Sequence, residues 1–131
     1  DPRDLFRGDY VVLSYDISTL DLSKLTSDAA NLEAGKTVYV ELALSDGYGV
    51  PLGVRQNPPQ GALFIKGRVK DARQQRLFVE YGIESYFVPE GKGREIERRP
   101  RNDLDVKVSI DRFGNAVIKA LVVNGTEVRF S

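Results

Sequence analysis

The side chains of this chain that could do chemistry are its carboxylates, lysines, serines and tyrosines, because the sequence contains no His and no Cys. A chain without His lacks the usual general base at neutral pH and the commonest metal ligand. A chain without Cys has no thiolate nucleophile, no disulfide and no thiolate zinc site. These absences exclude Ser-His-Asp, Cys-His and His-ligated metal mechanisms within the chain. Carboxylate pairs, a Ser-Lys pair or an oxygen-ligated cation remain, and we expect neither a cofactor nor a metal.

Asp9, Tyr10 and Tyr15 form the first group of candidate functional residues, near the start of the chain. The pair Gly8-Asp9 also suits a turn into a strand, because Gly can adopt positive φ and an Asp carboxylate can bond the backbone two residues on. The alternative is a carboxylate site that Asp9 forms with Tyr10, Tyr15 or a distant Arg. The sequence selects no partner for Asp9.

Lys66 and Arg68 form the second group, within the run Ile65–Val69. Together with Gly8–Leu13, this run is faintly similar to the Gly-Asp and Lys-Arg-Val strands of type I signal peptidases. Those enzymes pair a Ser with a Lys whose burial lowers its pKa, so that a neutral amine acts as the base. The similarity implies a hydrolase-like enzyme that uses Lys66 or carboxylates near Asp9, although no Ser precedes the Gly-Asp pair.

Glu84, Tyr86 and Phe87 form the third group, in an aromatic and acidic stretch. One interpretation is that the aromatic rings belong to the core and the acids are solvated. The other is a groove in which Tyr86 and Phe87 pack a partner peptide beside Arg94 or Arg98, since aromatic and Arg side chains dominate binding hot spots.

The composition indicates one globular domain. The chain has 131 residues, of which 41% are hydrophobic, and such a chain can fold around a single core, so we place one domain at 1–131. Lys plus Arg and Asp plus Glu both total 19, which gives a formal net charge of zero. A neutral chain has no global field that would draw it to a polyanion, and we expect no nucleic-acid partner.

The elements that would position these residues are mostly strands. Runs of β-branched and aromatic residues at period two predict strands, and the turn signals Asp46-Gly47 and Asn124-Gly125 separate some of them. The predicted strands span 10–17, 36–44, 50–55, 62–69, 76–83, 104–110, 116–123 and 127–130. Ser27 predicts the cap of a short helix over 27–33, and the segment after Pro89 predicts a short helix or an excursion loop. We therefore predict an all-β-dominated fold, an antiparallel β-barrel or strongly curved sheet with one or two short helices.

The apolar positions of the predicted strands define the expected core. Residues at period two share one face of a strand, so the apolar face of each strand should be buried. The predicted core residues are Val11, Leu13, Val38, Val40, Leu63, Ile65, Leu77, Val79, Val106, Val108, Ile110 and Leu121.

The run Gly8–Tyr15 fits the pattern G-D-Y-x-x-L-x-Y at every fixed position. The chain therefore resembles the GDYXXLXY family, whose members are also similar to it over 1–7, 66–69, 81–91 and 111–116. The resemblance implies a bacterial protein anchored by an N-terminal membrane helix, with this domain outside the cytoplasm on the periplasmic or extracellular face. It also implies genes of multi-pass membrane proteins as frequent neighbours, and no established activity.

We therefore expect an interaction module of the cell envelope that works with neighbouring multi-pass membrane proteins. Exposed strand edges could accept a partner strand. The resemblance also implies a membrane helix and a further β-like segment ahead of Asp1. If that segment is a strand, this chain exposes an edge that a second copy, a swapped segment or the loop 18–35 would cover. A homo-oligomer is thus among the expected assemblies.

Overall fold

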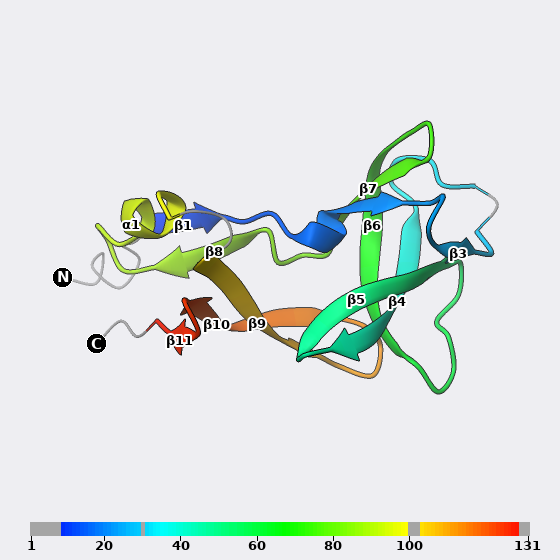
Figure 1. The fold of residues 1–131 in the computed structure, drawn as a ribbon. Coiled ribbons are helices and arrows are strands. Elements are labelled where there is room, and N and C mark those ends of the chain that lie inside the picture. The colour runs from blue at the N-terminus through cyan, green and yellow to red at the C-terminus, as the bar shows by residue number, and fades with distance from the viewer. Residues whose placement is uncertain (1–8, 30, 100–102, 129–131) are drawn as a thin grey trace. The chain divides into compact units, whose positions relative to one another are not determined.

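The computed structural model describes residues 9–29, 31–99 and 103–128, and for Asp9, Tyr10 and Val12 it describes the backbone alone. Strands dominate these residues, and the contacts among them divide the chain into two compact units. The sheet unit consists of Ser14–Gly82 and Ile110–Ala116. The terminal unit consists of the described residues of Asp1–Leu13, Ile83–Ser109 and Val117–Ser131. Figure 1 shows the elements of each unit.

The sheet unit is built on one six-stranded sheet. Its strands are β2 (Thr19–Asp21), β3 (Thr26–Ser27), β4 (Thr37–Ser45), β5 (Tyr48–Arg55), β6 (Leu63–Arg73) and β7 (Arg76–Glu80), and the 3-10 helix η2 (Asp16–Ser18) precedes them. The spatial order is β2-β7-β6-β4-β5-β3, and every pair is antiparallel except β3 with β5. Register shifts between β4 and β5 and between β6 and β7 add local twist, which contributes to the curl of the sheet in Figure 1.

One face of this sheet carries the core of the sheet unit, because apolar residues alternate with polar ones along its strands. In β4, for example, Val38, Val40 and Leu42 are buried, whereas the residues between them are half-buried. The buried apolar residues of the unit are Leu20, Val38, Val40, Leu42, Val54, Ile65, Val69, Leu77, Val79 and Tyr81. Full burial of such a side chain stabilises the fold by roughly 1.5–3 kcal/mol. We call the opposite face, which carries Tyr39 and Lys66, the outer face.

The terminal unit combines two small sheets with a short helix. β1 (Asp9–Val12) pairs with β8 (Ser85–Val88) in antiparallel register, and α1 (Gly93–Glu97) packs against β1. β9 (Leu104–Ile110), β10 (Ala116–Val123) and β11 (Thr126–Glu127) form a three-stranded sheet in the order β11-β10-β9. The buried apolar residues of this unit are Val11, Leu13, Ile83, Val88, Ile96 and Leu121.

The structure confirms the predicted fold class, a strand-dominated fold with a strongly curved sheet and short helices. The hairpins predicted around Asp46-Gly47 and between 69 and 76 are β4–β5 and β6–β7. The meander predicted from Leu104 onward is β9–β10–β11. The expectation of a single domain over 1–131 stays a prediction, which one cooperative unfolding transition would check.

Three predicted features are wrong. The strand expected over 10–17 ends at Val12, because Asp16–Ser18 form η2, in which the Ser18 N–H donates to the Tyr15 carbonyl. The helix expected over 27–33 is not formed by its described residues, since Ser27 belongs to β3. Leu63 is exposed, because it lies at the very start of β6.

The remaining core prediction is largely confirmed. Eight of the twelve predicted core residues are buried, which are Val11, Leu13, Val38, Val40, Ile65, Leu77, Val79 and Leu121. Val106, Val108 and Ile110 in β9 are half-buried. In the part of the chain that the structure describes, no helix is long and apolar enough to span a bilayer.

Candidate interaction surface

The hairpin β4–β5 exposes large apolar side chains at its closed end. Leu44, Tyr48, Val50 and Leu52 are between 42% and 70% exposed. The turn between the strands has Asp46 and Gly47 at φ of 52° and 83°, as expected for the Asp-Gly turn of a two-residue hairpin. Exposed apolar side chains that gather at one end of an element mark sites of protein or membrane interaction.

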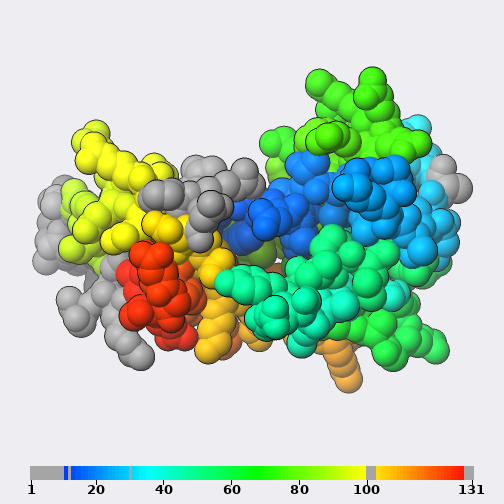
Figure 2. All heavy atoms as spheres, in the orientation of Figure 1, coloured from blue at the N-terminus to red at the C-terminus, as the bar shows by residue number. Residues whose placement is uncertain are grey.

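The register of the hairpin places these side chains on both of its sides. Val50 lies opposite Ala43, and Leu44 lies opposite Gly49. Directly opposed residues share a face, and successive residues alternate, so Val50 and Leu44 point to different faces. Neither face of the closed end is therefore polar. The blue-green spheres of the hairpin form part of the face seen in Figure 2.

The edge of β5 on the side away from β4 is only partly covered. Of the eight residues of β5, β3 pairs with Gly53 and Val54, and no other described strand pairs along this edge. The backbone from Gly49 to Pro51 therefore lies at a strand edge, where a partner strand could add. Pro51 lies in this stretch and carries no N–H, which restricts how a strand could pair there.

The outer face of the sheet carries aromatic and cationic side chains on its central strands. The rings of Tyr39 in β4 and Phe64 in β6 meet edge to face, with centroids 5.8 Å apart. Lys66 lies directly opposite Tyr39, and Arg68 lies opposite Thr37. Lys66 and Arg68 are both exposed, and neither side chain has a hydrogen bond or an ion pair with another described residue.

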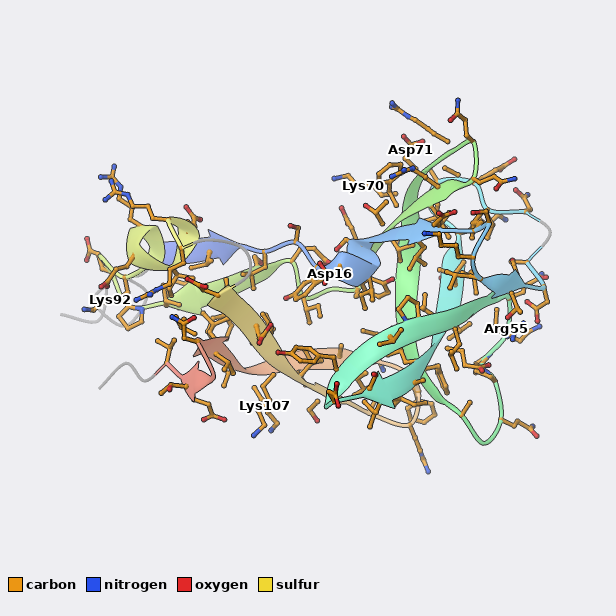
Figure 3. All side chains as sticks on the ribbon, viewed as in Figure 1. Asp16, Arg55, Lys70, Asp71, Lys92 and Lys107 are labelled. Carbon is orange, nitrogen blue, oxygen red and sulfur yellow. The ribbon has the colours of Figure 1, made fainter. Side chains whose placement is uncertain are left out.

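Two further cations of this face, Arg55 and Lys70, each lie close to a carboxylate. The Arg55 Nε lies 3.5 Å from a Glu41 carboxylate oxygen, and the Lys70 Nζ lies 3.5 Å from a Glu80 carboxylate oxygen. Figure 3 shows Arg55 at the end of β5 and Lys70 near the end of β6. Pairs this exposed contribute little to stability, but they cancel charge locally.

The loop 110–116 lies against β6 and is folded around one carboxylate. An Asp111 carboxylate oxygen accepts hydrogen bonds from the Asn115 and Phe113 backbone N–H groups, each at 2.9 Å. The backbone N–H of Asn115, which stabilises the ionised form, lowers the pKa of Asp111. The loop is joined to β6 by the Lys66 N–H, which donates to the Gly114 carbonyl at 2.8 Å.

This loop presents a cation stacked on an exposed ring. The Arg112 guanidinium carbon lies 4.8 Å from the centroid of the Phe113 ring, and Phe113 is 58% exposed. Such a pair is a cation–π contact. The next residue, Gly114, approaches the Phe64 ring so closely that a Cβ there would lie 2.8 Å from the ring. The loop therefore brings Gly114, the residue that follows this pair, against Phe64.

The structure separates the predicted site residues between the two units. Lys66, Arg68 and Tyr15 belong to the sheet unit, and Tyr15 is half-buried next to η2, where its N–H donates to the Ser18 hydroxyl at 2.9 Å. Lys66 is exposed and has no hydroxyl or carboxylate partner among the described residues. A Ser-Lys mechanism needs a lysine that is buried and hydrogen-bonded to its nucleophile, and Lys66 is neither.

The other predicted site residues lie in the terminal unit. The backbones of Asp9 and Tyr10 pair with Val88 and Phe87, and their side chains lie outside the described atoms. Tyr86 and Glu84 are half-buried, and the Leu13 N–H donates to the Glu84 carbonyl at 2.8 Å.

Among the described side chains of the terminal unit, those of Tyr86 and Phe87 are not brought together. Phe87 is 41% exposed and follows the half-buried Tyr86, so the two rings point to opposite faces of β8 and do not share a face. The described residues contain no group of three or more His, Cys, Asp or Glu placed to hold a metal ion.

Sequence reasoning missed the hairpin end and the loop pair. Leu44 and Val50 stand on either side of a turn signal, and their spacing was compatible with a buried hairpin. Arg112 and Phe113 lie between two strands, and a single aromatic residue in a loop has no periodic pattern from which its role could be predicted.

Comparison with known proteins identifies the family. No curated protein and no solved structure gave a match. The family model described as GDYXXLXY protein matches residues 1–121, a span that includes every strand of the sheet unit and the loop 110–116. The chain therefore belongs to the GDYXXLXY family.

Proposed function

We propose that this chain is an interaction module of the bacterial cell envelope, which binds a neighbouring multi-pass membrane protein through the closed end of β4–β5. In this proposal the module is membrane-anchored and lies outside the cytoplasm, on the periplasmic or extracellular face. The exposed apolar side chains of Leu44, Tyr48, Val50 and Leu52 support it, because a monomeric surface rarely keeps such side chains together.

The edge of β5 adds a second means of contact. A partner strand beside Gly49–Pro51 would gain backbone hydrogen bonds, while Val50 and Leu52 would supply apolar contacts. A second copy of the chain could use the same edge, and we include a homo-oligomer in the proposal. Pro51 makes a long, continuous ladder unfavourable, so a short strand is the better fit.

Cross-linking in native cells tests the proposal. A photo-reactive residue at position 50 of the full-length protein should trap a multi-pass membrane protein. The same residue at position 117 is the matched control, because Val117 is also a strongly exposed apolar residue, 61% exposed, in another part of the chain. Cross-links to a second copy would instead identify the homo-oligomer.

Substitution gives an independent measurement. Leu44→Ser with Val50→Ser should weaken the affinity for the membrane protein by roughly 30-fold or more, and so reduce its co-purification, since each hot-spot side chain contributes about 1–2 kcal/mol or more. Val117→Ser should leave recovery unchanged. Equal recovery with the wild type and the hairpin variant would refute the proposal.

A further inference from the structure

The outer face of the sheet unit has a row of cations along its central strand. Lys66 and Arg68 are two positions apart in β6 and so point to the same side. Lys70 follows them, and its contact with Glu80, which lies opposite Arg68, places it on that side as well. These positions alternate with the buried Ile65, Gly67 and Val69.

The charges of this row are only partly neutralised by carboxylates. Glu80 is paired with Lys70, and Glu41 is paired with Arg55. Lys66 and Arg68 have no carboxylate within ion-pair distance in the described part of the chain. Among the described residues, Lys66 and Arg68 are therefore cations without an ion-pair partner, in a chain whose formal net charge is zero.

Aromatic side chains adjoin these cations. Tyr39 lies opposite Lys66 and meets the Phe64 ring, and Gly114 lies against that ring. Phe113, the residue before Gly114, is largely exposed. Basic and aromatic side chains together are typical of surfaces that contact the headgroup region of a bilayer.

The position in the sheet decides what this face can contact. β6 pairs with β4 over 63–68 and with β7 over 68–73, and the loop 110–116 bonds it at Lys66. Where β6 is paired, its backbone groups are engaged in the sheet, so the outer face presents side chains there. Mobile lipid headgroups can adjust to the fixed spacing of strand side chains, whereas an acidic polypeptide would need matching spacing of its own.

We propose that the outer face of β4 and β6, with Lys66 and Arg68 at its centre, binds the headgroups of anionic phospholipids. The cations attract the phosphates, and the neighbouring aromatic rings of Tyr39, Phe64 and Phe113 lie at the headgroup boundary. This contact is peripheral and weak, and it does not depend on the protein partner of β4–β5.

Vesicle binding tests the proposal with the 131-residue chain. The probes are vesicles of phosphatidylcholine alone and of an equimolar mixture with phosphatidylglycerol. Each cation near an anionic bilayer strengthens binding roughly fivefold, so two uncompensated cations predict a preference of about 25-fold for the mixed vesicles. The preference should fall as salt is added, because salt screens exposed charges.

Matched variants separate this face from overall charge. Lys66→Glu with Arg68→Glu should abolish the preference, and Lys66→Gln with Arg68→Gln should reduce it strongly. Lys24→Glu with Lys119→Glu changes the net charge as much as the first pair at exposed positions elsewhere, and it should retain most of the preference. Circular dichroism of each variant checks that the strands are intact.

Three results would overturn the proposal. The first is no preference of the wild type for the mixed vesicles. The second is an equal loss in both charge-reversed pairs, which would indicate a net-charge effect. The third is binding to poly-glutamate without binding to the mixed vesicles, which would assign the face to an acidic polypeptide. A failure to recover a membrane protein through β4–β5 changes none of these measurements.

Discussion

Replacing Gly114 by alanine should destabilise the sheet unit more than any ordinary surface substitution. Gly114 has φ of +87°, which L side chains rarely adopt, and its carbonyl accepts a hydrogen bond from the Lys66 N–H. A Cβ built on Gly114 would lie 2.8 and 2.9 Å from two atoms of the Phe64 ring and 2.9 Å from the Lys66 backbone N. The ring can turn aside, but the backbone of β6 is held in the sheet.

The expected cost has two parts. The left-handed backbone conformation costs a residue with a Cβ roughly 1–2 kcal/mol relative to glycine. Overpacking against a fixed neighbour costs typically 1–3 kcal/mol more. We therefore expect Gly114→Ala to lower the free energy of unfolding by about 3 kcal/mol, a large share of the stability of a small domain.

Gly47→Ala is the matched control for this prediction. Gly47 lies in the same unit at φ of +83°, and a Cβ there would have nothing within 4 Å. Only the conformational part of the cost applies, so we expect about 1 kcal/mol. Urea denaturation followed by circular dichroism measures both values. If the two variants lose the same free energy, the close approach of the loop to β6 does not contribute and the reasoning fails.

Three further predictions concern packing, a buried hydrogen bond and acid stability. Gly67→Ala should lower the free energy of unfolding by about 1–3 kcal/mol, because its Cβ would collide with a Val79 methyl group. In a double-mutant cycle, Gly67→Ala with Val79→Ala should lose less free energy of unfolding than the sum of the two single variants. Tyr81→Phe should lower the free energy of unfolding by about 1–2 kcal/mol in the same assay, because the side chain of Tyr81 is buried and its hydroxyl donates to the Ile17 carbonyl at 2.5 Å. An unchanged denaturation midpoint would contradict this. The hydrogen bonds that lower the pKa of Asp111 below 3.8 give stability that is present above that value and lost as the pH falls through the lower, folded pKa. Asp111→Asn should therefore show a smaller loss of stability on acidification below about pH 4, and a loss equal to that of the wild type would count against this assignment.

The sequence predicted those parts of the fold that depend on local alternation and turn chemistry. The hairpin at Asp46-Gly47 is an example, because the turn signal and the period-two pattern agree there. The helix expected after Ser27 failed because its polar residues bond elsewhere. An Asp28 carboxylate oxygen accepts from the Gln56 N–H at 2.8 Å, just beyond the ends of the paired strands β3 and β5. Such a long-range contact leaves no local trace in the sequence.

The candidate surface was less accessible to sequence reasoning. Lys66 and Arg68 were identified from a run of residues, but their exposure on a central strand comes from the register of β6 with β4. The pairing of Glu41 with Arg55 and of Lys70 with Glu80, which leaves Lys66 and Arg68 without an ion-pair partner among the described residues, likewise depends on strand order. The formal net charge of zero does not reveal a local excess of positive charge on one face of the sheet.

The path of the chain through the two units has a consequence for the order in which they can form during synthesis. All six strands of the sheet unit lie between Thr19 and Glu80, so its sheet can close before the later residues leave the ribosome. β1 cannot pair until Val88 has been synthesised, because Asp9 pairs with Val88.

The loop 110–116 arrives later still, after β9 has been made. Until Gly114 docks, the Phe64 ring and the Lys66 N–H lack the neighbour that they have in the finished structure. The nascent sheet therefore passes through a stage with an exposed aromatic ring and an open stretch of strand edge, and a chaperone or a premature partner would meet it there.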